Sequence, residues 1–411
     1  MKYGCIGEHL KHSFSKEIHN ALADYEYEIR EIAKDELSNF AETKNFSAIN
    51  VTIPYKERIM PYMYYIDEHA KEIGAVNTVV NRLGKLYGYN TDFYGMSMLI
   101  KHTGVEIKGK KVIILGTGGT SKTSLAVSKA LGAKSVIRVS RSAREDAVSY
   151  SELYGKHCDA DVIINTTPSG MFPNISDSPV ELSIFKNLSG VIDAVYNPLR
   201  TTLILEARKR GIAAEGGLYM LVAQAVRASE IFIDTKYSDT ETERVFKKMM
   251  RDKENIVLIG MPASGKTTVG GILAEKYGRE IIDTDALIEE RAGKPIPAIF
   301  EENGEAFFRS LESEIINEVS ARTGVIISIG GGAVLNESNV ESLKKNGKLY
   351  FIDRPLAALL PTSDRPLAST REAIEKRYAE RYSIYTAAAD IRIDADCDAN
   401  SVAEKIERNF G

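Results

Sequence analysis

The stretch NIVLIGMPASGKTTVG, residues 255–270, constrains the fold of this chain more than any other segment. A short apolar run enters a glycine turn, and a helical pattern follows at Lys266 and Thr267. This spacing fits G-x-x-x-x-G-K-[ST], in which backbone N–H groups wrap the phosphates of a nucleotide. The lysine neutralises the β and γ oxygens, and the threonine is an oxygen ligand for Mg²⁺. We therefore predict an α/β domain that binds ATP through Gly260, Ser264, Gly265, Lys266, Thr267 and Thr268.

A second glycine turn lies earlier, in KKVIILGTGGTSKTS at residues 110–124. Gly116, Gly118 and Gly119 follow an apolar strand pattern, and a helix is expected to start around Ser121. Ser121 stands where the third glycine of G-x-G-x-x-G would be. This turn alone therefore fits either a dinucleotide site or an ordinary glycine-rich turn between a strand and a helix.

The next strand along the chain decides the predicted cofactor. In NAD-binding folds an acidic residue near the end of that strand binds the ribose hydroxyls. Here SVIRVSRSAR, residues 135–144, ends in two hydroxyl and two guanidinium side chains. Guanidinium groups pair well with the oxygens of a 2′-phosphate, although two solvated arginines on a loop are the alternative. We predict NADP(H), bound by Gly116, Gly118, Gly119, Ser140, Arg141, Ser142 and Arg144.

Composition excludes several classes of function. The chain has 411 residues, of which 44% are hydrophobic and 27% charged, as is typical of a soluble protein with two or three domains. A net charge of -4 gives no general attraction to nucleic acid or anionic membranes. The three cysteines lack the paired spacings of zinc and redox motifs, and no stretch approaches about 18 consecutive apolar residues. We expect a cytoplasmic enzyme, monomeric or homodimeric, without nucleic-acid or membrane partners.

Short apolar runs alternate with helical patterns along the chain, which is typical of parallel α/β sheets. The polar segment 236–254 separates two parts. We predict an N-terminal α/β substrate lobe over residues 1–100 with return helices in 216–250, an NADP-binding Rossmann domain over 101–215, and a P-loop domain with a parallel sheet over 252–411. The expected strands are 46–54, 111–115, 135–140, 161–167, 190–196, 255–260, 324–332 and 348–353.

Seven motifs in the first part of the chain resemble the shikimate dehydrogenases. They appear in the order of that family as HSFSKEIHN (12–20), NVTIPYKE (50–57), GAVNTVV (74–80), GYNTDFYG (88–95), NTTPSGM (165–171), DAVYNPLRTTLI (193–204) and GGLYMLVAQA (216–225). The resemblance implies reduction of 3-dehydroshikimate to shikimate with NADPH.

The same resemblance implies roles for single residues. Lys56 resembles the catalytic lysine of the family, and Asp92 resembles its carboxylate partner. Such a lysine suits the reaction, because ketone reduction needs a proton donor beside the carbonyl. Ser13 and Ser15 match the pair that binds the substrate carboxylate. The residues implied in binding substrate hydroxyls are Thr52, Asn77, Asp92 and Gln224, with Asn50 as a further candidate. Gly217 matches a position that lets the nicotinamide approach, and Tyr196 either orients the substrate ring or only packs.

In the second part, Asp283 and Asp285 lie two residues apart where a strand is expected to end. At the carboxyl edge of a parallel sheet, one carboxylate can serve the acceptor hydroxyl or the water of a metal, and the other can hold neighbouring hydroxyls. Arg309, the glycines at 330–332 and Arg381 add two cations and a close backbone approach. Such a pocket suits a small polyhydroxy acid.

These runs resemble the shikimate kinases. GMPASGKTT, DTDALIEE, IPAIFEENGEAFFRSLE, ISIGGGAV, DRPLA and ERYSIYTAAADIRID follow the family order. The resemblance implies phosphorylation of shikimate to shikimate 3-phosphate, with Asp283 as the catalytic carboxylate and Thr267 and Asp283 at Mg²⁺. The residues implied in binding shikimate are Asp285, Arg309, Gly331, Gly332 and Arg381.

The lid of the kinase departs from the family. Arg365 is the implied lid arginine that reaches the transferred phosphate. Only five residues separate it from Leu359, and the second arginine often found there is absent. Arg354 and Arg371 are the candidates to replace it.

Each resemblance supports the other, because the product that the first implies is the substrate that the second implies. We predict a bifunctional enzyme of the shikimate pathway, with 3-dehydroshikimate and shikimate as its small-molecule substrates and NADP(H), ATP and Mg²⁺ as cofactors. One alternative is a catalytically inactive sensor or regulator of the same pathway. The other is a quinate/shikimate dehydrogenase fused to a different small-molecule kinase.

Overall fold

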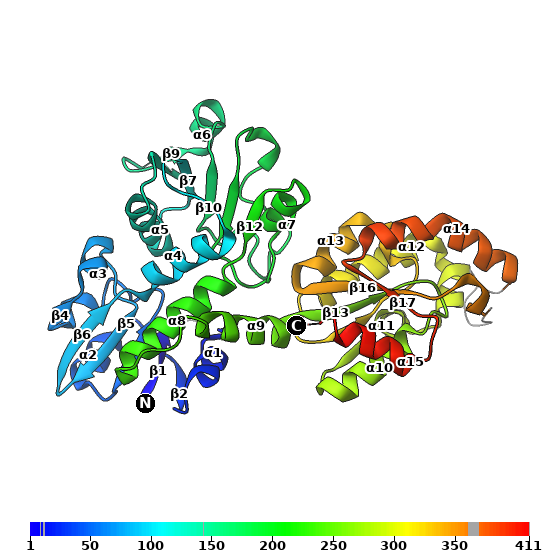
Figure 1. Cartoon of the computed structure of the whole chain (residues 1–411), viewed down its shortest axis with the longest axis horizontal. Helices are drawn as coiled ribbons and strands as arrows, with labels where there is room; N and C mark the ends of the chain where they lie inside the picture. Colours follow the sequence, from blue (N-terminus) through cyan, green and yellow to red (C-terminus); the bar gives the residue numbers. More distant parts are fainter. Residues whose placement is uncertain (9, 11–12, 143, 361–369, 411) are drawn as a thin grey trace. The chain divides into compact units, whose positions relative to one another are not determined.

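The computed structural model describes residues 1–8, 10, 13–142, 144–360 and 370–410. Within these residues three β-sheets alternate with helices, as Figure 1 shows, which confirms the predicted α/β class. The chain divides into two compact units, Met1–Lys247 and Lys248–Gly411. The first unit holds two six-stranded sheets, and the second holds one five-stranded sheet. Among the described helices, none combines the length and apolarity needed to cross a membrane.

The first sheet has the strand order β2-β1-β3-β5-β6-β4. Strands β1, β2 and β3 are parallel, whereas β5 runs antiparallel to both β3 and β6. Only β3 of this sheet is expected from the sequence, and many side chains of β2, β4 and β6 are polar or exposed, which hides their strand pattern. The elements of this lobe are β1 (Tyr3–Gly7), α1 (Ser15–Leu22), β2 (Tyr27–Glu31), α2 (Leu37–Thr43), β3 (Ala48–Val51), η1 (Met60–Tyr62), β4 (Tyr65–Ile66), α3 (Glu68–Ile73), β5 (Thr78–Arg82) and β6 (Lys85–Tyr89).

The second sheet is fully parallel and has the order β12-β11-β10-β7-β8-β9. The strand order reverses between β7 and β10, and ligands of open α/β sheets bind at the carboxyl ends of strands at such a point. The first glycine turn leaves β7 there. The elements are β7 (Lys111–Leu115), α5 (Gly119–Ala130), β8 (Ser135–Ser140), β9 (Val148–Ser149), α6 (Tyr150–Lys156), β10 (Val162–Asn165), η2 (Leu182–Ile184), β11 (Gly190–Asp193), α7 (Thr202–Lys209) and β12 (Ala213–Glu215).

Two long helices join these sheets within the first unit. Helix α4 (Thr91–Thr103) and helix α8 (Leu218–Ile233) cover one face of the second sheet, where Leu99 and Tyr219 belong to the same buried cluster as Ile114. Further along α8, Phe232 packs with Tyr27 against the first sheet. Helix α8 therefore contacts both sheets. Helix α9 (Glu241–Lys253) follows it.

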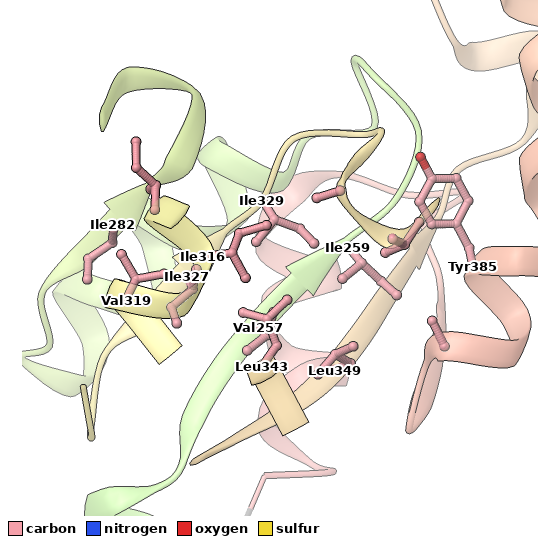
Figure 2. Close-up of a cluster of buried hydrophobic side chains, with 14 of the residues drawn as sticks. Val257, Ile259, Ile282, Ile316, Val319, Ile327, Ile329, Leu343, Leu349 and Tyr385 are labelled. Atoms are coloured by element: carbon pink, nitrogen blue, oxygen red, sulfur yellow. The ribbon is translucent and has the colours of Figure 1, made fainter. Parts of the chain in front are cut away.

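The sheet of the second unit has the order β14-β15-β13-β16-β17 and is parallel throughout. Alternate residues of β13 face opposite sides: Val257 belongs to the cluster drawn in Figure 2, and Leu258 to the cluster on the other face. Both faces are buried, which explains why these strands read as continuous apolar runs. The elements are β13 (Asn255–Ile259), α10 (Lys266–Tyr277), β14 (Ile281–Asp283), α11 (Thr284–Ala292), α12 (Ile296–Ser320), β15 (Ile326–Ser328), η3 (Ala333–Leu335), α13 (Glu337–Asn346), β16 (Gly347–Asp353), η4 (Leu356–Ala358), α14 (Arg371–Ala388), β17 (Ile391–Asp394) and α15 (Ala399–Glu407).

The core of the first lobe contains a histidine, His19, that is fully buried. Its ring stacks on Tyr27 with centroids 3.9 Å apart, and its Nδ1 lies 2.6 Å from the hydroxyl oxygen of Tyr25. Burial opposes the charged form and lowers the pKa of His19 to about 3.

We expect this histidine to make the lobe sensitive to acid. The unfolded chain binds the proton near pH 6.5 and the folded chain only near pH 3. The contribution of neutral His19 to the free energy of unfolding is therefore complete above pH 6.5 and is lost as the pH falls toward 3. Between pH 6.5 and 5 the loss is about 2 kcal/mol. Replacing His19 by Phe keeps the stacking and removes the titration, so urea unfolding at pH 7 and pH 5 should show a smaller pH dependence. An unchanged pH dependence would contradict this assignment.

Candidate active sites

Lys56 and Asp92 form an ion pair in the first lobe. Lys56 Nζ donates to Asp92 Oδ2 at 2.6 Å, and the two side chains are 20% and 12% exposed. Asp92 is the second residue of α4, whose start is fixed by Asn90, which accepts a hydrogen bond from Phe93 N. On the other side, the backbone of Lys56 accepts a hydrogen bond from Val76 N at 2.8 Å. The pair thus presents a largely buried ammonium that can give a proton to a ligand and a carboxylate that holds it.

Asn77 and Gln224 lie next to this pair. Asn77 Oδ1 accepts a hydrogen bond from Thr91 N at 2.7 Å, and Thr91 precedes Asp92 in α4. The hydroxyl of Thr91 lies 3.3 Å from Gln224 Oε1, which brings a residue of α8 to the same place. Four of the residues predicted from the sequence, Lys56, Asp92, Asn77 and Gln224, are therefore linked through α4.

Asn50 also bonds to Asn77, through Nδ2 and the backbone oxygen at 3.4 Å, whereas the two serines, Thr52 and Tyr196 are separate from that network. Ser13 Oγ donates to Ser15 Oγ at 3.0 Å, and Ser15 is the first residue of α1. The backbone N–H of Thr52 donates to Ile6 O at 3.0 Å. Among the described residues, no hydrogen bond joins either serine to the Lys56 pair. Tyr196 packs its ring 5.4 Å from that of Phe14, which lies between the two serines in the chain, and burial raises the pKa of Tyr196.

The first glycine turn has the shape of a phosphate site. Gly116 has a φ of 107°, and a Cβ atom there would lie 2.8 Å from Thr166 Oγ1. A Cβ on Gly118 or Gly119 would meet no atom within 4 Å, so the start of α5 is open. Ser121 is fully buried and donates its hydroxyl to Gly116 O at 2.7 Å, which explains how the turn closes without a third glycine. The turn fits the pyrophosphate of a dinucleotide at a helix N-terminus.

The basic segment after β8 contains an acidic residue that the sequence reasoning missed. Arg144 Nε donates to Asp146 Oδ1 at 3.0 Å, and Arg138 donates to the other oxygen of the same carboxylate. These contacts, with the hydrogen bond from Arg144 first, lower the pKa of Asp146. Arg141 is exposed and makes no ion pair with a described residue. Ser140 and Ser142 face each other with their hydroxyl oxygens 3.3 Å apart.

A further ion pair brings the two lobes of the first unit together. Lys122 of α5 donates to Glu57 at 2.6 Å, and Glu57 follows Lys56 in the chain. The start of α5 therefore lies near the Lys56 pair. Gly217 lies close to the backbone of Ala194, and a side chain there would clash with its carbonyl group.

The second glycine turn is shaped for a triphosphate. Lys266 is buried at the end of this turn. Its Nζ donates to Gly260 O and Met261 O at the start of the turn, at 3.0 Å each. Gly265 has a φ of 93°, and a Cβ atom there would meet no other atom within 4 Å. The hydroxyl of Ser264 is buried without a hydrogen-bond partner among the described residues. An unpaired buried hydroxyl in such a cradle fits the oxygen of a bound phosphate.

Thr267 and Asp283 meet at the carboxyl edge of the sheet. Thr267 Oγ1 donates to Asp283 Oδ2 at 2.9 Å and lies 3.5 Å from Ser328 Oγ. Asp283 also caps α11 by accepting a hydrogen bond from Asp285 N at 3.0 Å. Hard oxygen ligands of this kind suit Mg²⁺, which takes its remaining ligands from water and substrate phosphates.

The three consecutive glycines lie against the other residues expected at the acceptor. A Cβ on Gly330 would lie 2.5 Å from Asp285 Oδ1 and 3.1 Å from Glu312 Oε1. A Cβ on Gly332 would lie 2.7 Å from Cζ of Arg309. Glycine is therefore required for Asp285 and Arg309 to approach the same backbone turn. Gly331 completes the turn, and a Cβ atom there would lie 3.0 Å from Cδ of Pro262 in the phosphate loop.

Two residues of this pocket were missed by sequence reasoning. Glu312 accepts a hydrogen bond from Arg309 Nη1 at 2.7 Å and is 1% exposed; burial raises its pKa, and Arg309 opposes this shift. Tyr385 donates to Gly331 O, which also accepts from Arg381 Nη1 at 3.1 Å. Figure 2 shows Tyr385 at the margin of the apolar core, and burial raises its pKa to about 12. Spacing within α12 and α14 could have suggested both, since each lies one helical turn beyond its arginine.

The predicted lid falls largely outside the described residues. Arg365 lies in the segment 361–369, outside them. Arg371, a candidate to replace the missing lid arginine, donates through Nε to Glu375 at 2.8 Å and through Nη1 to Leu356 O and Leu359 O. Its guanidinium is thus held between Glu375 of its own helix and two carbonyl groups at η4.

Comparison with known proteins agrees with this arrangement. Residues 5–79 match the family described as shikimate dehydrogenase substrate binding domain, and residues 262–410 match the shikimate kinase family. A shikimate dehydrogenase (NADP(+)) from Clostridium perfringens is 36% identical over 265 residues, covering 60% of this chain and 97% of the relative.

Two solved structures are similar over the same part. Shikimate dehydrogenase 1 from Peptoclostridium difficile has 37% identity and a TM-score of 0.56, covering 61% of this chain and 98% of its own. A chorismate mutase/shikimate 5-dehydrogenase fusion protein from Clostridium acetobutylicum has 35% identity and a TM-score of 0.57, covering 60% and 96%. The chain therefore belongs to the shikimate dehydrogenase family and carries a shikimate kinase domain in the same polypeptide.

Proposed function

We propose that this protein catalyses two consecutive reactions: reduction of 3-dehydroshikimate to shikimate with NADPH, and transfer of a phosphoryl group from ATP to the 3-hydroxyl of shikimate. One observation carries the proposal. A single chain contains domains of two families, and the product of one is the substrate of the other. NADP and ATP follow from the same families.

In the dehydrogenase, the ion pair of Lys56 and Asp92 supports a role in proton transfer. When bound, NADPH supplies the hydride, and the ketone oxygen then needs a proton. The Lys56 ammonium, held at 2.6 Å by Asp92, is the group that we assign to that proton. Asn77 and Gln224, linked to Asp92 through α4, are assigned to the substrate hydroxyls, and Thr52 and the Ser13–Ser15 pair to its remaining oxygens.

For the cofactor, the open start of α5 supports binding of the pyrophosphate at Gly116, Gly118 and Gly119. Arg141 and Arg144 are assigned to the 2′-phosphate, with Ser140 and Ser142 beside them. Gly217, which is pressed against Ala194, is assigned to the approach of the nicotinamide.

In the kinase, the assigned residues converge on the three glycines and the phosphate loop. Lys266 stabilises charge on the transferred phosphate, and Asp283 draws the proton from the acceptor hydroxyl. Thr267 and Asp283 offer oxygens to Mg²⁺, which supplies charge neutralisation between phosphates. The residues assigned to shikimate are Asp285, Arg309, Gly331, Gly332 and Arg381, and Arg365 is assigned to the lid.

The domain limits and location that we propose follow from the same arrangement. The substrate lobe comprises residues 1–100 with 216–250, the NADP domain 101–215 and the kinase 252–411. Cys5, Cys158 and Cys397 are free thiols, which supports a reducing compartment such as the cytoplasm.

No observation favours the alternatives. An inactive sensor would not need the paired Lys56 and Asp92, nor the convergence of Arg309 and Arg381 on one turn. A different kinase would fit the phosphate loop but not that pair of arginines beside Asp285.

To test this proposal, purified protein is incubated with 3-dehydroshikimate and NADPH, with and without Mg²⁺ and ATP. We expect NADPH to be consumed in both cases and shikimate 3-phosphate to form only when Mg²⁺ and ATP are present. NADPH consumption and product formation are followed separately, by absorbance and by mass spectrometry. Phosphorylation of quinate in preference to shikimate, or failure to reduce 3-dehydroshikimate, would refute the corresponding half.

A further inference from the structure

The side-chain amide of Asn77 has a fixed orientation. Its Oδ1 accepts a hydrogen bond from Thr91 N at 2.7 Å and lies 3.1 Å from Thr78 Oγ1. A backbone N–H can only donate, so the amide atom that faces it must be the oxygen. Asn77, Thr78 and Thr91 are 3%, 0% and 2% exposed, so water cannot replace these contacts. The amide nitrogen, which bonds to no described residue, is left as a donor for a ligand.

A chain of hydrogen bonds behind Thr78 gives it a definite direction. Asn50 Nδ2 lies 3.4 Å from Asn77 O, which can only accept, so the nitrogen of the Asn50 amide points to that side. The same nitrogen donates to Thr78 Oγ1 at 3.2 Å. Thr78 therefore receives a proton from Asn50, and its own proton is available to Asn77 Oδ1 or to Thr91 Oγ1, which lies 3.1 Å from Thr78 Oγ1 and 3.2 Å from Asn77 Oδ1.

The chain begins at a buried tyrosine. Tyr27 is fully buried and donates its hydroxyl to Asn50 Oδ1 at 2.7 Å. Its ring is held by the stacked ring of His19. Donation thus runs in one direction from Tyr27 through Asn50 to Thr78, whose hydroxyl faces Asn77 Oδ1. Each group satisfies the next, and none of these buried contacts needs water.

We propose that Thr78 is a positioning residue of the dehydrogenase, and that the chain Tyr27–Asn50–Thr78 holds Asn77 as a donor toward the substrate. This inference rests on the proposed reduction of 3-dehydroshikimate. A fixed donor favours a ligand that places a keto or hydroxyl oxygen opposite it, because an unpaired buried N–H is costly. Thr91 anchors the same oxygen through its backbone, which a side-chain substitution leaves in place.

Thr78→Val tests the proposal, because valine keeps the shape and strand preference of threonine and removes only the hydroxyl. Oxidation of shikimate by NADP⁺ is the convenient assay. We expect the KM for shikimate to rise by roughly tenfold, the scale of one lost buried hydrogen bond, with the KM for NADP⁺ unchanged. Thr78→Ser should recover most of the loss. Thr103→Val, at the far end of α4, is the matched control, since its hydroxyl donates to Leu99 O within its own helix.

A double-mutant cycle with Asn77→Ala separates positioning from a purely structural role. If Thr78 acts through Asn77, Thr78→Val has little further effect once Asn77 is alanine. Where turnover is slow, the dissociation constant of shikimate is measured by calorimetry, and the effect of Thr78→Val on it is compared in the wild-type and Asn77→Ala backgrounds. An equal rise in both backgrounds, or an equal loss of NADP⁺ affinity, would overturn the inference while leaving the proposed function intact. A wild-type enzyme that does not oxidise shikimate would instead overturn the proposed function, and this inference with it.

Tyr27→Phe tests the remote end of the chain. Phenylalanine keeps the stacking on His19 and removes only the hydroxyl that orients Asn50. We expect Tyr27→Phe to raise the KM for shikimate by a smaller factor than Thr78→Val does. In protein that already carries Thr78→Val, adding Tyr27→Phe should change this KM little. A larger effect on NADP⁺ than on shikimate would exclude Tyr27 from the chain.

Discussion

Lys56→Ala should stop the reduction of 3-dehydroshikimate and leave the phosphorylation of added shikimate unchanged. Its ammonium is the one cation that hydrogen-bonds to Asp92 among the described residues, so its loss removes both the proton donor and the partner of that carboxylate. Removing a general acid typically lowers turnover by about 10²–10⁴-fold. The measurement is NADPH oxidation at saturating substrate, together with formation of shikimate 3-phosphate from added shikimate.

The matched control for this variant is Lys101→Ala. Lys101 is an exposed lysine in the last turn of α4, the helix that begins beside Asp92. It removes the same charge from the same unit, and we expect reduction to continue at close to the wild-type rate. Substantial reduction by Lys56→Ala, in protein that binds NADPH normally, would show that another group supplies the proton.

Lys266→Met should have the opposite effect, with phosphorylation lost and reduction retained. Methionine keeps the length of the side chain and removes the charge that stabilises the transferred phosphate. Loss of one such preorganised donor typically costs about 10²–10³-fold in turnover. The rate of shikimate 3-phosphate formation from shikimate, ATP and Mg²⁺ gives the effect directly.

Lys276→Met is the control for this loss. Lys276 lies in the same helix, α10, and pairs on the surface with Glu407 at 2.6 Å. Exposed ion pairs contribute little, so we expect full kinase activity. If Lys266→Met also abolished reduction in folded protein, the assignment of two independent sites would be wrong.

Much of the candidate kinase site follows from short-range patterns. The spacing from Gly260 to Thr267 predicts a turn and a helix start, because Gly260 and Gly265 permit the positive φ angles that the turn requires. The fully parallel sheets were also accessible, since strands buried on both faces, such as β13 and β16, are continuous apolar runs. The hairpin of β5 and β6 was not predicted, because its pairing places mixed polar and apolar residues opposite one another.

The groups that support the predicted residues were hidden for a different reason. Tyr385 bonds to Gly331 from 54 residues away, and Thr91 lies beside Gln224 from 133 residues away. Helical spacing marks Tyr385 only as a neighbour of Arg381, and no local pattern marks its contact with Gly331 or that of Thr91 with Gln224. Asp146 pairs with Arg144, but its carboxylate carries the same negative charge as a phosphate. The sequence pattern of a phosphate site therefore does not point to it.

The sequence by itself determined the two glycine turns and the two families, and it predicted the residues that we assign to their chemistry, because these depend on spacing along the chain. The tertiary structure decided how those residues are held. It placed Glu312 behind Arg309, and it placed Thr78 between Asn50 and Asn77. The direction of a hydrogen bond depends on which acceptor lies opposite each donor, and only the folded chain brings the two together.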